Sequence, residues 1–302
     1  MSDSLRRRLE RHLEGGTSGL TALVVQGGGM RGVYSMGALS HLEKTGLRCA
    51  FDLVVGSSAG AINGAYLLAG QAIDAVRVYV DNLSTRNFVN LLRLNRIVDI
   101  DYMVDVALKK KCPLDLDTLH GSPCLLQAIL TDAETGEATV FTNRDNMDIY
   151  EVIRATAALP ALYNRKVKVG DRAYIDGGLS ETVPVQRALA FGAEFSLVVL
   201  TRQAGFRRKP SSAVWRFLSR LAARGQSTAV RSMIGSEDVV FSDAMNMLEN
   251  QSEEFNLFGV WPSDMVKMVG RTTNDRSELE ACAAMGERDM QYALDAPIQS
   301  SR

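Results

Sequence analysis

Residues 53–68 read LVVGSSAGAINGAYLL, and this stretch decides how the chain folds around its most reactive candidate residue. An apolar run ends in the pattern Gly-x-Ser-x-Gly, formed by Gly56, Ser58 and Gly60. The run is typical of a buried strand, and the small apolar residues after it favour a helix. In a tight strand-to-helix turn the central serine projects outward and can act as a nucleophile. The pattern therefore predicts Ser58, rather than its neighbour Ser57, as the reactive serine.

A glycine-rich turn precedes this stretch. Residues 21–26, TALVVQ, are typical of a buried strand, and GGGMRG follows at 27–32 before a helical pattern at 33–44. Three glycines let backbone N–H groups approach a ligand, and the start of a helix adds positive potential. We therefore expect an anion-stabilising loop, to which the N–H of Ala59 contributes from the serine turn. A turn that only connects the strand to the helix is the alternative.

The same six residues match G-x-G-x-x-G, the pattern of a dinucleotide-binding turn. Asp52 lies 20 residues after Gly32, near the spacing of the acid that binds the ribose. That acid belongs at the carboxyl end of the second strand, whereas Asp52 stands at the start of the run 53–55. An oxidoreductase that binds nicotinamide or flavin at this turn is therefore an alternative with weaker support.

The order of elements predicts the fold class. Strand, helix, strand and helix follow one another between residues 21 and 68, which indicates right-handed βαβ units and a parallel sheet. We expect an α/β fold with a mostly parallel central sheet flanked by helices. Further strands are expected at 124–130, 138–141, 167–169, 173–175 and 195–200, further helices at 72–82 and 184–191, and a mostly helical region after 202 with a strand near 258–260.

Composition and charge exclude several classes of protein. The chain has 302 residues, 46% of them hydrophobic, and a net charge of −1, so no overall field recruits nucleic acid. Residues 53–73 carry no charge but contain four glycines, Asn63 and Gln71, which favours a buried strand and helix over a membrane span. The four cysteines lack the spacing of a zinc site, which favours reduced thiols in a cytosolic protein.

The base for this serine is not an obvious histidine. The chain has His12, His41 and His120, whereas a histidine triad on an α/β-hydrolase fold runs serine, acid, histidine. His120 follows the serine but lies in a polar loop with no supporting pattern. Asp176 ends a predicted strand and precedes two glycines, so that it can approach another backbone closely. It is the candidate base, and an ordinary Asp-Gly turn is the alternative.

Three motifs in order, GGGMRG at 27–32, GSSAG at 56–60 and IDGG at 175–178, resemble the patatin-like phospholipase family. The resemblance is strongest to the shorter bacterial-type members and extends over about 20–200. It includes ATAALP at 155–160, which is similar to the small-residue segment before the catalytic aspartate of that family.

The resemblance implies a three-layer patatin-like fold, a lipid ester substrate, and neither an organic cofactor nor a metal. It also implies three regions: an N-terminal helical extension at 1–19, a catalytic domain at 20–202, and a mostly helical extension at 203–302 packed on it. The chain departs from the family pattern at Thr182 and Val183, where many members have an asparagine shortly before the proline.

The resemblance further implies how the site works. Ser58 attacks an ester carbonyl, and Asp176 accepts its proton directly, which replaces a triad with a Ser–Asp dyad. Backbone N–H groups near the second and third glycines of the loop, with Met30 as a further candidate, meet the developing oxyanion. Arg31 either braces this loop or attracts an anionic head group. The predicted site comprises the catalytic Ser58 and Asp176, the oxyanion-loop residues Gly27, Gly28, Gly29, Met30, Arg31, Gly32 and Ala59, and the supporting glycines Gly56, Gly60, Gly177 and Gly178.

Residues 212–224, SAVWRFLSRLAAR, place apolar residues on one helical face and Arg216, Arg220 and Arg224 on another. Such a basic amphipathic helix can lie transiently on an anionic membrane surface. A helix docked on the core with its arginines in water is the alternative. We expect a serine lipid acyl hydrolase of phospholipase A or lysophospholipase type, cytoplasmic and peripheral at membranes. A non-catalytic lipid-binding protein, and acyl transfer to an acceptor other than water, stay as alternatives.

Overall fold

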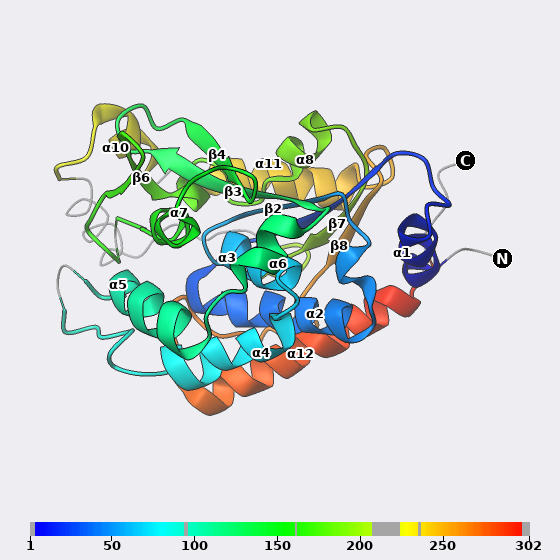
Figure 1. The fold of residues 1–302 in the computed structure, drawn as a ribbon, viewed down its shortest axis with the longest axis horizontal. Helices are drawn as coiled ribbons and strands as arrows, with labels where there is room; N and C mark the ends of the chain where they lie inside the picture. Colours follow the sequence, from blue (N-terminus) through cyan, green and yellow to red (C-terminus); the bar gives the residue numbers. More distant parts are fainter. Residues whose placement is uncertain (1–3, 94–95, 161, 207–223, 235–236, 298–302) are drawn as a thin grey trace.

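One sheet runs through the middle of the molecule (Figure 1). The computed structural model of the chain describes residues 4–93, 96–160, 162–206, 224–234 and 237–297. Within these residues the strand order is β5-β6-β3-β2-β1-β7-β8, and β4 pairs with β3 outside this path. The strands are β1 Leu20–Val25, β2 Leu53–Ser57, β3 Leu125–Asp132, β4 Ala138–Thr142, β5 Val167–Val169, β6 Arg172–Asp176, β7 Ala193–Val199 and β8 Leu257–Val260.

The centre of the sheet is parallel. β1 pairs in parallel with β2 and β7, β2 pairs in parallel with β3, and β7 pairs in parallel with β8. The strands β4, β5 and β6 join by antiparallel pairings. Parallel strands that are covered on both faces are apolar along their whole length. This explains why each residue of β2, LVVGS, is buried.

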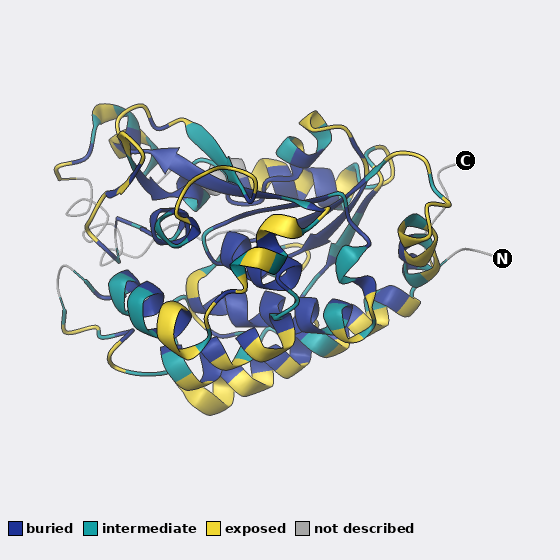
Figure 2. Cartoon of the chain, viewed as in Figure 1, coloured by how far each residue is buried: buried dark blue, intermediate teal, exposed yellow. Residues whose placement is uncertain are grey.

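Helices cover both faces of the sheet, so the chain forms three layers (Figures 1 and 2). In β1, Leu23 and Val25 face the core that includes α2, α3 and α12, whereas Ala22 and Val24 face the core that includes α8 and α11. The expected α/β fold with a mostly parallel central sheet is confirmed. The α-helices are α1 Leu5–Leu13, α2 Gly32–Lys44, α3 Ala59–Leu68, α4 Ala72–Arg77, α5 Ile100–Tyr102, α6 Leu116–Gly121, α7 Ile149–Thr156, α8 Val185–Ala190, α10 Thr228–Met233, α11 Glu237–Asn250 and α12 Arg276–Asp295.

The expected helix at 72–82 is an α-helix only in its first part. The α-helix α4 ends at Arg77, and the chain continues as wider π-helical turns. A second run of π-helical turns follows α5. These wide turns are η3 Val78–Leu83 and η4 Met103–Lys111, and the short 3₁₀ helices are η1 Gly29–Arg31, η2 Leu47–Cys49 and η5 Gly177–Leu179.

Residues after 202 contribute to the sheet and to one helix layer. β8 extends the sheet by pairing with β7, which confirms the expected strand near 258–260. The long helix α12 packs against α2, at the bottom of Figure 1. A Cβ at Gly286 would overlap the carbonyl oxygen of Tyr34, so the two helices approach more closely than other residues would allow. The expected boundaries at 19 and 202 stay predictions.

Two expectations about membranes have different outcomes. Residues 53–73 form β2, α3 and the start of α4, so the expected buried strand and helix are confirmed. Among the described helices, none combines the length and the apolarity needed to cross a bilayer. The basic segment 212–224 lies outside the described residues except for Arg224.

The close approach at Gly286 can be tested by a substitution that should destabilise the protein there but not at an open helical position. In an open helical position Gly→Ala stabilises or is neutral, because alanine has the higher helix propensity. At Gly286 the added methyl group meets the Tyr34 carbonyl, and we expect a loss of about 1–3 kcal/mol in the free energy of unfolding. Gly121→Ala in α6 is the matched control, because no atom lies within 4 Å of the added Cβ. Urea unfolding measures both, and equal effects would contradict the proposed close approach.

Candidate active site

The turn between β2 and α3 holds Ser58 in an unusual backbone conformation. Its φ is 54° and its ψ is −131°, a region that residues other than glycine rarely adopt. The turn is tight because Gly60 packs on the backbone of β1, where an added Cβ would overlap the carbonyl oxygen of Val25. The sharp strand-to-helix turn expected from the sequence is therefore present, and it points the Ser58 side chain away from the sheet toward a pocket.

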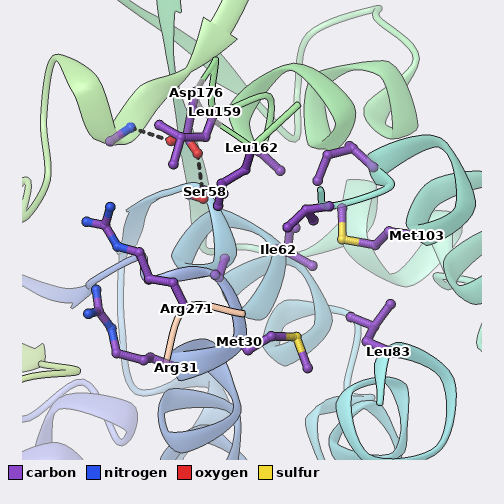
Figure 3. A pocket seen from close by; sticks show the side chains of 18 of the residues that line it. Met30, Arg31, Ser58, Ile62, Leu83, Met103, Leu159, Leu162, Asp176 and Arg271 are labelled. Carbon is purple, nitrogen blue, oxygen red and sulfur yellow. Dashed lines mark hydrogen bonds between the residues drawn. The ribbon is translucent and has the colours of Figure 1, made fainter. Parts of the chain in front are cut away.

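The hydroxyl of Ser58 meets the carboxylate of Asp176, which lies 118 residues later. The Ser58 Oγ donates a hydrogen bond to Asp176 Oδ2 over 2.9 Å (Figure 3). The other carboxylate oxygen, Oδ1, accepts the N–H of Gly178 over 2.7 Å. The Asp176 backbone is fixed as well, because its carbonyl oxygen accepts the hydroxyl of Thr131 over 2.9 Å. The residue is only 5% exposed, so little water competes for the oxygen that faces the serine.

The hydroxyl of Thr156 stabilises the turn that carries Ser58. The Ser58 N–H donates to Thr156 Oγ1 over 2.9 Å, and that hydroxyl donates to the carbonyl oxygen of Ile129 over 2.6 Å. Thr156 is completely buried at the end of α7. The sequence stretch ATAALP at 155–160 contributed to the resemblance, but its threonine was not expected to touch the nucleophile. A contact of this kind depends on which strands pair, and no local pattern reports it.

The other candidate residues take structural roles. The Ser57 hydroxyl donates to the carbonyl oxygen of Glu181 over 2.8 Å. Asp52 accepts the N–H of Thr21 over 2.8 Å and pairs with His12 over 2.9 Å. His120 contacts the carbonyl oxygen of Asn143 over 2.6 Å. All three histidines are within the described residues, and none of them lines the pocket at Ser58.

The glycine-rich loop lies beside the Ser58 hydroxyl, but its N–H groups are not equivalent. The Met30 N–H already donates to the carbonyl oxygen of Arg271 over 3.1 Å, so we leave it out of the candidate oxyanion hole. The N–H groups of Gly28, Gly29 and Ala59 have no acceptor within the described part of the chain. Gly29 adopts a φ of +60°, which favours glycine, and this turn leaves its N–H beside the pocket.

A buried polar network ties this loop to α3. The Asn63 side-chain amide donates to the carbonyl oxygen of Gly32 over 2.8 Å, and its oxygen accepts the Tyr79 hydroxyl over 2.9 Å. Burial raises the pKa of Tyr79 well above its ordinary value, so the phenol stays protonated and remains a donor. The network therefore fixes the start of α2 relative to the helix that begins after Ser58.

The pocket has a polar end and an apolar body. It holds about 1060 Å³ of space, including space open to solvent at its mouth. Arg31 and Arg271 line the polar end, and Figure 3 shows both guanidinium groups on the side away from Met103 and Leu83. Apolar side chains from α3, η3, α5 and η4 line the body, among them Ile62, Tyr66, Val78, Leu83, Ile100, Met103 and Leu108.

The structure brings most of the predicted site residues together. Nine of the thirteen predicted residues line this one pocket: Gly27, Gly28, Gly29, Met30, Arg31, Ser58, Ala59, Asp176 and Gly178. The remaining glycines Gly32, Gly56, Gly60 and Gly177 lie behind it, packed against neighbouring side chains and backbone. Sequence reasoning did not find Arg271, Asn63 or the apolar wall between 78 and 108.

Comparison with known proteins identifies the family to which this fold and site belong. The family model for patatin-like phospholipase matches residues 23–189, more than half of the chain. The chain therefore belongs to the patatin-like phospholipase family, and the resemblance stated from its motifs is confirmed. Membership supports a lipid hydrolase activity in general terms.

Similar proteins come from several bacteria. The chain is 27% identical over 253 residues to the uncharacterized protein YjjU of Escherichia coli K12. This match covers 81% of this chain and 69% of YjjU. It is 26% identical over 193 residues to the uncharacterized NTE family protein Rv1063c of Mycobacterium tuberculosis H37Rv. This second match covers 62% of this chain and 50% of Rv1063c. Among solved structures, VipD from Legionella pneumophila matches with a TM-score of 0.48 and 14% identity, over 92% of this chain and 67% of VipD.

The role of Thr156 can be tested by removing only its hydroxyl. Thr156→Val keeps the shape of the side chain but removes the buried acceptor of the Ser58 N–H and the hydroxyl bond to the Ile129 carbonyl oxygen. We expect a loss of about 1–3 kcal/mol in the free energy of unfolding. Thr156→Ser retains the hydroxyl and is expected to lose less than half as much. Chemical denaturation measures both, and a valine variant as stable as the serine variant would contradict the role.

Proposed function

We propose that the protein is a serine lipid acyl hydrolase that cleaves carboxylic ester bonds, with Ser58 as nucleophile and Asp176 as its base. The observation that carries the proposal is the 2.9 Å hydrogen bond from Ser58 Oγ to Asp176 Oδ2 at the polar end of an apolar pocket. A nucleophile within hydrogen-bond reach of a fixed base is the arrangement that acyl transfer requires.

In the proposed acylation step, the Ser58 oxygen attacks the ester carbonyl while its proton passes to Asp176. The carbonyl oxygen becomes an oxyanion, which the N–H groups of Gly28, Gly29 and Ala59 are placed to stabilise because no acceptor occupies them in the described part of the chain. The bond to the leaving alcohol then breaks, Asp176 returns the proton to the alcohol oxygen, and an acyl-serine is left.

In the proposed deacylation step, a water molecule gives a proton to Asp176 and attacks the acyl-serine. Collapse of the second tetrahedral intermediate releases the fatty acid and returns the proton to Ser58. An alcohol in place of water would make the same step an acyl transfer. No step of this scheme calls on a metal ion or an organic cofactor.

The two ends of the pocket suggest the kind of ester. An acyl chain suits the apolar body between α3, η3 and η4, and the half-buried Arg271 at the cationic end suits an anionic head group, whereas Arg31 is only 3% exposed. These features support a substrate of phospholipid or lysophospholipid type. We also propose that the protein acts in the cytoplasm and that the basic segment 212–224 contacts anionic membranes transiently.

The alternatives have weaker support. A dinucleotide-binding turn needs its acid at the carboxyl end of the second strand, and Asp52 lies at the other end, bonded to Thr21 and His12. A non-catalytic lipid-binding protein would have no use for a serine held in a rare conformation against a carboxylate.

The nucleophile can be tested without knowledge of the natural substrate. We expect Ser58→Ala to abolish labelling by a fluorophosphonate probe, and Ser58→Ala and Asp176→Asn to lower ester hydrolysis by a factor on the order of 10⁴ or more. Ser57→Ala is the matched control and keeps most of the labelling, because its hydroxyl is bonded to the Glu181 carbonyl. Circular dichroism checks that each variant is folded. Labelling that persists in the Ser58→Ala protein rules out the assignment.

The acyl role of the pocket can be tested by filling it. Met103 is buried in the pocket wall, and Met103→Trp adds bulk where an acyl chain would lie. We expect the ratio of kcat/KM for hexadecanoyl against butanoyl p-nitrophenyl esters to fall at least about tenfold. Met147→Trp is the control, because Met147 is exposed and does not line the pocket. An unchanged ratio in the Met103 variant would remove the acyl chain from this space.

A further inference from the structure

Two consecutive leucines are exposed to solvent beside the pocket. Leu91 is 70% exposed and Leu92 is 91% exposed, whereas the other exposed large apolar residues of the described chain stand singly in the sequence. Single exposed apolar residues are normal on protein surfaces. Two such residues in succession add apolar area at one point, which favours a partner that tolerates leucine.

Backbone and side-chain contacts fix the described residues of the segment that carries the leucines. Its two arms meet where Val89 pairs with Val98, and the N–H of Asn90 donates to the carbonyl oxygen of Ile97 over 2.8 Å. The Arg93 guanidinium closes the base by donating to the carbonyl oxygens of Arg86 and Asn87 at 2.6 and 3.2 Å. These contacts fix the residues on both sides of Leu91 and Leu92, while the two side chains stay exposed to solvent.

The base of the same loop forms part of the pocket wall. Phe88 and Val98 are buried and line the pocket into which Ser58 points. The N–H of Val98 also donates to the carbonyl oxygen of Leu162, another pocket residue, over 3.1 Å. In Figure 1 the described parts of this segment lie at the edge of the molecule near α5. One short segment therefore carries both apolar side chains of the pocket wall and the exposed Leu91 and Leu92.

The charges near Leu91 and Leu92 favour an anionic surface as the partner. The sequence from 84 to 98 has three arginines and no acidic residue. Arg93 and Arg96 pair with aspartates at the base of the loop, whereas Arg86 is exposed and has no ion pair within the described residues. Exposed leucines next to an exposed cation are the combination that binds the interface of an anionic bilayer.

We propose that the exposed pair Leu91 and Leu92 docks the protein on an anionic lipid surface and sets the pocket against the layer that supplies its substrate. The role given to docking, which is to bring the pocket to its substrate, rests on the proposed function. The binding of the two leucines to lipid does not depend on that function. It concerns a surface separate from the segment 212–224. A lipid layer fits better than a second copy of the chain, because the apolar side chains continue inward to a pocket suited to an acyl chain.

Vesicle binding tests the docking surface independently of catalysis. We would measure flotation of the Ser58→Ala protein with vesicles of phosphatidylcholine and phosphatidylglycerol, so that hydrolysis cannot change the lipid. Adding Leu91→Ser and Leu92→Ser is expected to weaken binding by about tenfold to a hundredfold. Tyr292→Ser, at a site 74% exposed on α12, is the matched control and is expected to change binding less than twofold. Arg86→Gln is expected to weaken binding about fivefold on these vesicles.

Several results would overturn the proposal. They are a double leucine variant that binds as tightly as its parent, a parent protein that does not bind, or a parent that is a dimer in solution and becomes a monomer when the leucines are replaced. Failure of the proposed function has a different signature. If Ser58→Ala still hydrolyses soluble butanoyl esters, the catalytic assignment fails while vesicle binding is unaffected. If the double leucine variant alone, with Ser58 intact, keeps soluble-ester turnover but loses vesicle binding, docking is supported.

Discussion

The backbone of Ser58, held at a φ of 54° between β2 and α3, is the constraint on which the rest of the site depends. Such a conformation costs about 1–3 kcal/mol and persists only where the surroundings fix it. Before Ser58, the strand β2 is buried in the middle of a parallel sheet. After it, Gly60 at the start of α3 packs on the backbone of β1, and the Thr156 hydroxyl accepts the Ser58 N–H. The large core on both faces of the sheet makes these supports rigid.

The pairing register of the strands explains how residues 118 positions apart come within 2.9 Å. In the β2–β3 pairing Ser57 lies beside Ile129, and in the β3–β6 pairing Leu130 lies beside Asp176. Ser58 therefore follows the partner of Ile129 on one side of β3, and Asp176 is the partner of the next residue, Leu130, on the other side. A shift of one residue in either pairing would turn a side chain to the opposite face of the sheet and separate the two groups. The antiparallel strand β6 is thus as important for the site as the parallel centre.

The sequence was sufficient for the strands, the serine turn and the glycine-rich loop, because each depends on residues close together in the chain. Pairing Ser58 with Asp176 needed the resemblance as well, since the residues alone left an ordinary Asp-Gly turn open. The pocket wall between 78 and 108 could not be predicted, because its apolar residues face an open space from wide π-helical turns and follow no regular stripe. The roles of Thr156 and Arg271 were hidden for a different reason. They act through a contact with a backbone group far away in sequence, which composition and spacing do not record.

The family model ends at residue 189, yet the site draws on residues beyond it. The Arg271 carbonyl oxygen takes the Met30 N–H, and without it that N–H would compete with those of Gly28 and Gly29 for a partner. The segment between β8 and α12, which contains Arg271, contacts α12 at Asp289, whose carboxylate accepts the Tyr34 hydroxyl of α2 and the N–H of Ser263, each over 3.0 Å. Burial, with Asp289 nearby, raises the pKa of Tyr34, so the phenol remains a donor. Because α12 anchors this segment on the same helix that starts at the glycine-rich loop, the geometry of the loop depends on the carboxyl-terminal third of the chain as well as on the motifs that define the family.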